Sequence, residues 1–375
     1  MLPFAFFIAY GVMSIPAGLL IEKYQEKPVM VAAFVVAFLG SLILALFPNY
    51  LTAVFSLFLI GSGMAMLQVA INPLLREAGG EEHFALNATI AQLIFGAASF
   101  ISPLVYSYLV LNLEKTSSDS NILITTLSKI VPENIPWISL YWLFAVISLL
   151  MVGVIFISKI PEVERKADDQ VSALKTHLEL LKNPTVILFF LGIFTYVGLE
   201  QGVANWISEF LNKYHGYDPQ TTGAKTVAWF WGLMTIGGGV GIVLLKLLDS
   251  KIVLVIFTIA AIMSLTAALF MSGPAALIAF PLVGFFSSVM YPVIFSLALN
   301  SVEEHHGSFS GILVTAIVGG AVVPLIVGGL GDLMGLRNGM LFLFLPMAYI
   351  LSIGFWAKPL IKNVTVEFGK KEAAL

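Results

Sequence analysis

Residues 29–47 read VMVAAFVVAFLGSLILALF, an uncharged run of 19 residues that are almost all apolar. A helix needs about 20 such residues to cross the hydrocarbon core of a bilayer. Similar runs follow one another along nearly the whole chain. Candidate membrane-spanning helices lie near 2–21, 29–47, 51–75, 87–111, 138–158, 184–208, 223–247, 252–272, 273–299, 311–330 and 340–360. The sequence therefore predicts an all-α protein that crosses a membrane eleven times.

The overall composition agrees with this class and argues against several others. The chain is 59% hydrophobic and 11% charged, with a mean hydropathy of +0.96, whereas a soluble domain has about 25% charged residues. Strands of a membrane β-barrel are about 10 residues of alternating polarity, which these uninterrupted runs are not. The chain has no cysteine, so disulfides and thiolate metal sites are excluded. It also lacks a GxxxxGK[ST] motif, which argues against an ATP-driven pump.

The basic residues alternate between the two sides of the predicted bundle. Of the 19 Lys and Arg residues, 14 lie in one set of connectors, which comprises 22–28, 76–86, 159–183, 246–251, 300–310 and the tail from Lys358. Loops on the cytoplasmic side carry such an excess, so the C-terminus is expected in the cytoplasm and Met1 outside. A bundle with an even number of helices and both ends inside would need one more helix before Met1. We therefore expect the first of twelve helices to be missing from this sequence.

A charged connector divides the chain into two unequal parts. Residues 159–183 carry five basic and five acidic side chains, and apolar positions at helical spacing over 168–183 predict a short amphipathic helix. The connector separates an N-terminal half, 1–158, with five helices from a C-terminal half, 184–375, with six. The halves share an order of landmarks, such as Asn72-Pro73 in one and Tyr291-Pro292 in the other. Parallel repeats of this kind are typical of transporters, whose substrate sites lie near the midplane between the repeats.

The polar residues within the apolar runs are the candidate functional residues, because burying them in hydrocarbon is costly. Glu200 lies in the segment FTYVGLEQGVANW with Gln201 and Asn205, which are four residues apart, and with Trp206. We interpret the amides as the lining of a solvated cavity and Glu200 as a proton or gating site. The alternative is that Glu200 lies near the outer interface and is simply hydrated.

The N-terminal half carries a second set of amides. Gln68 and Asn72 share a helical face because they are four residues apart, and Gln92 lies in the next apolar run. These amides suit sugar hydroxyls, but they could equally bridge membrane helices. Trp206 and Tyr291 are candidate platforms for the apolar face of a sugar ring, with ordinary packing as the alternative. His305 and His306 lie in a solvated loop, and we predict no metal site there.

Several of these segments together resemble the fucose–galactose–proton symporter family of the major facilitator superfamily. The resemblance covers essentially the whole chain, and it rests on Ala17-Gly18 with Glu22-Lys23, Asn72-Pro73, Tyr196-Val197-Gly198 with Glu200, Tyr291-Pro292 with Ile294-Phe295-Ser296, and the stretch from Ile317 through Pro324 to Gly331-Asp332. It implies a fold of twelve helices in two six-helix halves, with Met1 at the start of the second helix. It also assigns Gly18, Glu22 and Lys23 to a motif at the first cytoplasmic loop.

The sequence departs from the family pattern in two ways. The family's first helix, which carries a carboxylate tied to substrate and proton handling, is absent, and Gln68 stands where members tend to have Glu. Glutamine does not titrate, so proton coupling would have to use Glu200 or an acid on a missing helix.

The expected function is import of a monosaccharide of the fucose, galactose or glucose type by alternating access between the two halves. The expected substrate-facing residues are Gln68, Asn72, Gln92, Gln201, Asn205, Trp206 and Tyr291, with Glu200 as the coupling or gating acid. The proton would be the coupling ion, and no cofactor, metal or nucleic acid is expected. The protein would be a monomer in the bacterial inner membrane. The alternatives are a transporter of an amino sugar or a drug, an uncoupled sugar uniporter, and an integral membrane enzyme.

Overall fold

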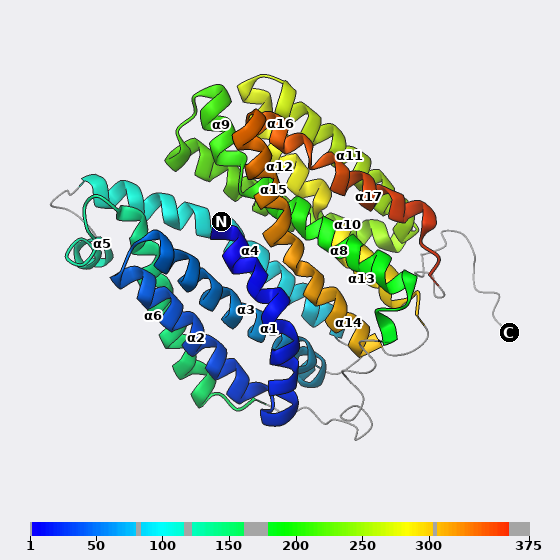
Figure 1. The fold of residues 1–375 in the computed structure, drawn as a ribbon, viewed down its shortest axis with the longest axis horizontal. Coiled ribbons are helices and arrows are strands. Elements are labelled where there is room, and N and C mark those ends of the chain that lie inside the picture. Colours follow the sequence, from blue (N-terminus) through cyan, green and yellow to red (C-terminus); the bar gives the residue numbers. More distant parts are fainter. Residues whose placement is uncertain (1, 80–83, 116–121, 161–178, 303–305, 360–375) are drawn as a thin grey trace, which may run out of the picture.

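The computed structural model describes residues 2–79, 84–115, 122–160, 179–302 and 306–359, and within these ranges some side chains, such as those of 22, 72, 73, 75–79 and 84–93, are not described. The structure is an assembly of helices (Figure 1). The helices of the N-terminal half are α1 (Leu2–Tyr24), α2 (Glu26–Leu46), α3 (Tyr50–Gly79), α4 (Phe84–Lys115), α5 (Ile122–Leu127) and α6 (Ser139–Ile157). Those of the C-terminal half are α8 (Pro184–Ala204), α9 (Ile207–His215), α10 (Ala224–Leu247), α11 (Ser250–Phe270), α12 (Gly273–Ser287), α13 (Met290–Leu299), α14 (His306–Thr315), α15 (Gly319–Met334), α16 (Leu336–Leu341) and α17 (Phe344–Trp356).

Eleven helical stretches in the described residues are long and apolar enough to cross a bilayer, as the sequence predicts. Five of them are built from consecutive helical pieces, over Pro136–Ile157, Pro219–Leu245, Gly273–Ala298, Gly311–Met334 and Leu336–Trp356. The sequence predicts one continuous helix over 273–299, but the structure breaks it between α12 and α13. Proline at position 292 has no N–H and crowds the carbonyl of residue 288, so the regular hydrogen bonding ends there.

Apart from α4, which packs mainly against α10, the described helices of each half pack mainly against one another, and the two groups lie side by side in Figure 1. In the N-terminal half, α3 packs against both α1 and α2, and α2 packs against α6. Gly61 and Gly63 of α3 permit this approach, because an added Cβ would collide with the backbone carbonyls of Phe6 in α1 and Ala33 in α2. Small residues at such crossings let membrane helices pack closely.

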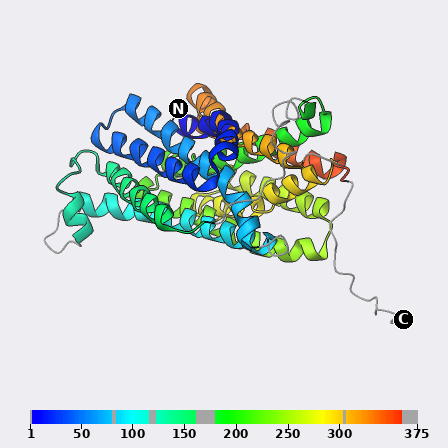
Figure 2. The same cartoon turned by 90° about the horizontal axis from the view of Figure 1, so that it is seen from below.

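The two halves meet along two seams. In the first, α1 packs against α14 and α15; in the second, α4 packs against α10, which runs beside it in Figure 2. In the second seam, Phe100 packs edge-on against Trp229 with ring centroids 5.5 Å apart. Nearby, the Ser107 hydroxyl donates a hydrogen bond to the Gln220 carbonyl oxygen. Gly96 is essential to this fit, because a side chain there would overlap Thr235.

The connection between the first two helices is shorter than the sequence predicts. Instead of a loop over 22–28, only Gln25 interrupts the helical chain between α1 and α2. Gln25 has φ 67° and ψ 177°, an extended conformation with positive φ that non-glycine residues rarely adopt and that turns the chain between the two helices. Consequently Gly18, Glu22 and Lys23 lie in the last turns of α1 and not in a loop. The predicted amphipathic helix over 168–183 falls almost entirely outside the described residues.

Each half has a lysine that ties the start of one helix to the C-terminal end of the last described helix of that half. The Lys27 ammonium donates a 2.8 Å hydrogen bond to the carbonyl of Ser158, the residue that caps the C-terminus of α6. The Lys251 ammonium donates a 2.7 Å bond to the carbonyl of Ala357, the residue that caps α17. A cation at a helix C-terminus also complements the helix dipole. We call these two contacts the lysine clasps.

Candidate substrate and coupling site

Glu200 is held by two neighbours on its own helix. The chain enters α8 through Asn183, whose side-chain oxygen accepts a hydrogen bond from the Thr185 N–H, and Pro184 occupies the first turn. Farther along α8, the Tyr196 hydroxyl donates a 2.6 Å hydrogen bond to Glu200 Oε2, and the Gln201 amide donates a 3.0 Å bond to Oε1. Both donors are neutral, so the carboxyl group gains hydrogen bonds here without a compensating charge.

The remaining walls of this site come from other helices. Tyr291 on α13 packs against Tyr196 with ring centroids 5.8 Å apart, and Phe295 stacks behind it at 5.7 Å. Tyr10 on α1 belongs to the same buried core cluster as Tyr196, against which Tyr291 packs, so a residue of the N-terminal half joins the group. The site therefore draws on both halves, and we call Tyr10, Tyr196, Glu200, Gln201 and Tyr291 the central cluster.

The residues of the central cluster lie within membrane-spanning segments. With a rise of about 1.5 Å per residue, Glu200 is about 24 Å along α8 from Pro184 and about one turn before the end of that span at Ala204, and Tyr10 is about 12 Å from the start of α1. Buried phenol and carboxyl groups need partners, and here the Tyr196 hydroxyl and the Glu200 carboxyl group are partners of each other. Such a group can bind hydroxyls by hydrogen bonds, stack a ring on the tyrosines, and take up or release a proton at Glu200.

The end of α8 places two predicted site residues differently. Asn205 caps the helix and its side chain is exposed. Trp206 donates its indole N–H to the Pro324 carbonyl oxygen at 3.2 Å, and its ring packs over Gly328 of α15. This contact gives Trp206 a partner inside the C-terminal half and fixes the turn between α8 and α9.

The other predicted residues are distributed along the N-terminal half. Gln68 is partly buried in α3. Asn72 lies in α3 and Gln92 in α4, but their side chains, like that of Glu22, are outside the described part of the structure. Gly18 of α1 faces open space, and Lys23 is exposed with its ammonium 5.0 Å from the centre of the Tyr24 ring.

Our sequence analysis did not include Tyr10 and Tyr196 among the site residues. Tyr196 precedes Glu200 by four residues, a spacing that places both on one helical face, so this signal was present in the sequence. Tyr10 carries a hydroxyl group in an otherwise apolar run, which also marks it. What the sequence does not show is that α1 brings Tyr10 beside helices almost 200 residues away.

The described residues contain no group of three or more His, Asp or Glu side chains that could hold a metal ion. Outside the membrane-spanning segments, hydrogen bonds from the Thr221 hydroxyl and N–H hold the pKa of the Asp218 carboxyl below its usual value. Asp218 caps the short helical segment that leads into α10.

The sequence profile of the Major Facilitator Superfamily matches residues 1–324. The chain belongs to this superfamily. It is 31% identical over 363 residues to a glucose/galactose transporter of Brucella abortus, covering 94% of this chain and 84% of that protein. It is 27% identical over 353 residues to an L-fucose-proton symporter of Escherichia coli, covering 88% and 78%.

Solved structures of the superfamily show the same fold. The transporter FucP in its outward conformation aligns with a TM-score of 0.69 at 23% identity, covering 95% of this chain and 89% of that one. A bacterial homologue of the lysosomal transporter Spinster, in an inward-facing and occupied conformation, aligns with a TM-score of 0.61 at 15% identity, covering 95% and 86%. The resemblance inferred from sequence motifs is thus confirmed, and the chain is a multi-pass membrane protein of a transporter superfamily.

Proposed function

We propose that this protein is a secondary transporter that imports a monosaccharide of the glucose, galactose or fucose type together with a proton. The observation that carries the proposal is the central cluster, in which Glu200 accepts hydrogen bonds from Tyr196 and Gln201 beside Tyr291. The names of the two relatives, a glucose/galactose transporter and an L-fucose-proton symporter, support the substrate class.

In this mechanism the sugar binds between the two halves. Tyr196 and Tyr291 offer aromatic faces to the ring, while amides such as Gln68 and Gln201 bind its hydroxyls. Asn72, Gln92, Asn205 and Trp206 remain candidates for further contacts. Glu200 takes up a proton from the outside and gives it up to the cytoplasm. Proton loss would leave a charge that accepts hydrogen bonds from Tyr196 and Gln201, so protonation and sugar binding can be coupled at one place.

The halves would alternate between outward and inward openings by rocking along the two seams. We place the protein in the bacterial cytoplasmic membrane, as a monomer with its C-terminus in the cytoplasm, because the basic connectors gather on that side. Neither a cofactor nor a nucleic-acid partner enters this mechanism.

The test is sugar-evoked proton movement in membrane vesicles, with fucose, galactose, glucose and N-acetylglucosamine tried in turn. One sugar should enter and alkalinise the external medium. Alanine at Gln68 should weaken that uptake. Entry of a sugar without proton movement would favour the second candidate, a uniporter, for which the neutral Gln68 is the supporting observation. If no sugar enters, the proposed substrate class is wrong.

A further inference from the structure

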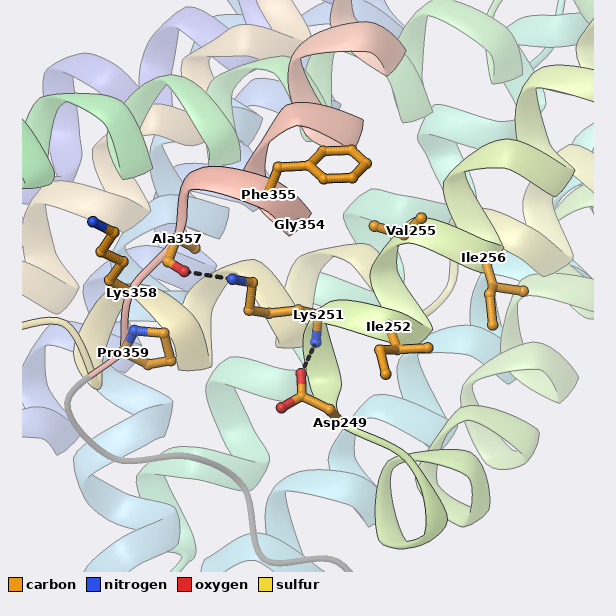
Figure 3. Close-up of a pocket in the computed structure, with 10 residues that line it drawn as sticks. All are labelled: Asp249, Lys251, Ile252, Val255, Ile256, Gly354, Phe355, Ala357, Lys358 and Pro359. Atoms are coloured by element: carbon orange, nitrogen blue, oxygen red, sulfur yellow. Dashed lines mark hydrogen bonds between the residues drawn. The ribbon is translucent and has the colours of Figure 1, made fainter.

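A cavity of about 580 Å³ lies at the end of the C-terminal half, between the start of α11 and the end of α17 (Figure 3). It is far along the chain from the central cluster, and the proposed transport mechanism makes no use of it. Its apolar wall consists of Ile252, Val255 and Ile256 on α11 and Phe355 on α17. The close approach of the two helices that forms its floor depends on Gly354, where a Cβ would overlap the Val255 side chain.

The polar rim of this cavity contains three charged groups, two of which already have partners. The Asp249 carboxylate accepts a 2.8 Å hydrogen bond from the Lys251 N–H and so caps α11, while the Lys251 ammonium forms the lysine clasp with the Ala357 carbonyl. Lys358 follows directly, and its exposed ammonium makes no recorded contact with the described residues; Figure 3 shows it pointing away from the clasp. The lining residues thus have a net charge of +1, and the Lys358 ammonium has no hydrogen-bond or ion-pair partner among the described residues.

The position of the cavity indicates what kind of molecule reaches it. The span of α11 begins at Ser250 and that of α17 ends at Trp356, so the rim lies at the level where hydrocarbon gives way to headgroups. The wall faces outward: Ile252 and Ile256 are each 51% exposed and Phe355 is 71% exposed. An occupant must therefore be apolar along the helices and negatively charged at the level of Lys358, as an anionic phospholipid is.

The N-terminal half repeats the same order of residues. Phe156, Ser158 and Lys159 stand to Lys27 as Phe355, Ala357 and Lys358 stand to Lys251. Phe156 and Lys159 are both exposed, and Lys27 forms the other clasp. An exposed aromatic side chain, a clasped carbonyl and a free lysine thus recur at the end of both halves. A purely local packing need at α17 does not account for this recurrence.

We propose that the cavity between α11 and α17 binds an anionic phospholipid, with its phosphate at Lys358 and an acyl chain along Ile252, Ile256 and Phe355. Attraction between a basic residue at the membrane surface and anionic lipid is worth ~1 kcal/mol per residue, which corresponds to about a fivefold change in dissociation constant. The clasped Lys251 adds its charge to the same rim and gives the headgroup a fixed neighbour. The proposal does not depend on what the transporter carries.

The test measures lipid binding to the purified full chain in detergent, by thermal unfolding during titration with single lipids. Phosphatidylglycerol should raise the Tm more than phosphatidylcholine of the same acyl composition. Lys358→Gln should weaken phosphatidylglycerol binding about fivefold, and Lys358→Arg should preserve it. Lys129→Gln, which alters an exposed lysine far from this cavity in the chain, should behave as wild type.

Three results would overturn the proposal. These are an equal effect of the two lipids on the wild-type protein, an unchanged preference for phosphatidylglycerol in Lys358→Gln, and a Tm increase with inorganic phosphate alone that equals that of the lipid. The last would show that the rim binds a free anion and that the apolar wall takes no part. Lys358 is exposed, so its replacement is not expected to disturb folding.

Discussion

Glu200→Gln removes a titratable group while leaving the shape of the central cluster intact. The two carboxylate oxygens accept hydrogen bonds from Tyr196 at 2.6 Å and from Gln201 at 3.0 Å. A glutamine can keep both contacts, because its oxygen accepts from Gln201 and its amide donates to the tyrosine oxygen. We therefore expect little change in folding and a specific loss of proton coupling.

The size of the expected effect follows from the driving force. One elementary charge crossing a potential of about 100 mV gains ~2.3 kcal/mol, which supports roughly a 50-fold accumulation of a co-transported sugar. Glu200→Gln should reduce this ratio to about 1 while sugar still equilibrates across the membrane. Purified protein in liposomes with an imposed potential, loaded with radiolabelled sugar, gives the ratio directly.

A matched control is Glu209→Gln, which changes an exposed carboxylate of α9 in the same half. It should accumulate sugar as the wild-type protein does. If Glu200→Gln also accumulates sugar to the wild-type level, Glu200 does not carry the proton and the coupling assignment is refuted. If both sugar equilibration and accumulation are lost, Glu200 serves binding rather than coupling.

Three other predictions concern the packing of α3 against α1, the seam between α4 and α10, and the cap formed by Asp218. Gly61→Leu should destabilise the protein by about 1–3 kcal/mol, because the new side chain would overlap the backbone of α1 at Phe6. A thermal unfolding scan in detergent measures this loss. An unchanged Tm would contradict the close approach of α3 to α1. Ser107→Ala should remove the hydrogen bond to Gln220. This should destabilise the closed contact between α4 and α10 by ~0.6 kcal/mol, which is about a threefold change in the equilibrium between closed and open forms of that seam. Because the native chain has no cysteine, labelling of a single introduced cysteine reports that opening, and equal labelling rates with and without Ser107 would refute the role of this bond. The lowered pKa of Asp218 means that its contribution to stability is present above its unfolded pKa of about 3.9 and is lost as the pH falls through the lower folded value. The Tm advantage of wild type over Asp218→Ala should therefore shrink as the pH falls through about 3.9 and below, and a constant difference would argue against a charged cap.

The sequence was sufficient to predict the spans, because hydropathy and length determine whether a helix can cross a bilayer. It also indicated Glu200 and its neighbour Gln201, since buried polar groups stand out against apolar runs. Helix breaks were harder to predict. Pro292 was visible, but whether a proline kinks a helix or ends it depends on the packing around it.

Contacts between distant segments could not be predicted from one sequence. Nothing near Trp206 in the chain shows that its indole binds the Pro324 carbonyl, 118 residues away. Likewise, a non-glycine residue with a positive φ is rare, so no local pattern predicts a one-residue turn at Gln25. These features arise from tertiary packing, which outweighs local preference.

The lysine clasps have a consequence for the history of the molecule. Each clasp joins the start of one helix to the end of the last described helix of the same half, and uses residues of that half alone. A contact made entirely within one half is retained when that half is copied as a unit. Equivalent bonds at equivalent positions are what the duplication of one ancestral unit would leave behind. The two clasps therefore indicate a common origin of the two halves, although most of the side chains between them have diverged.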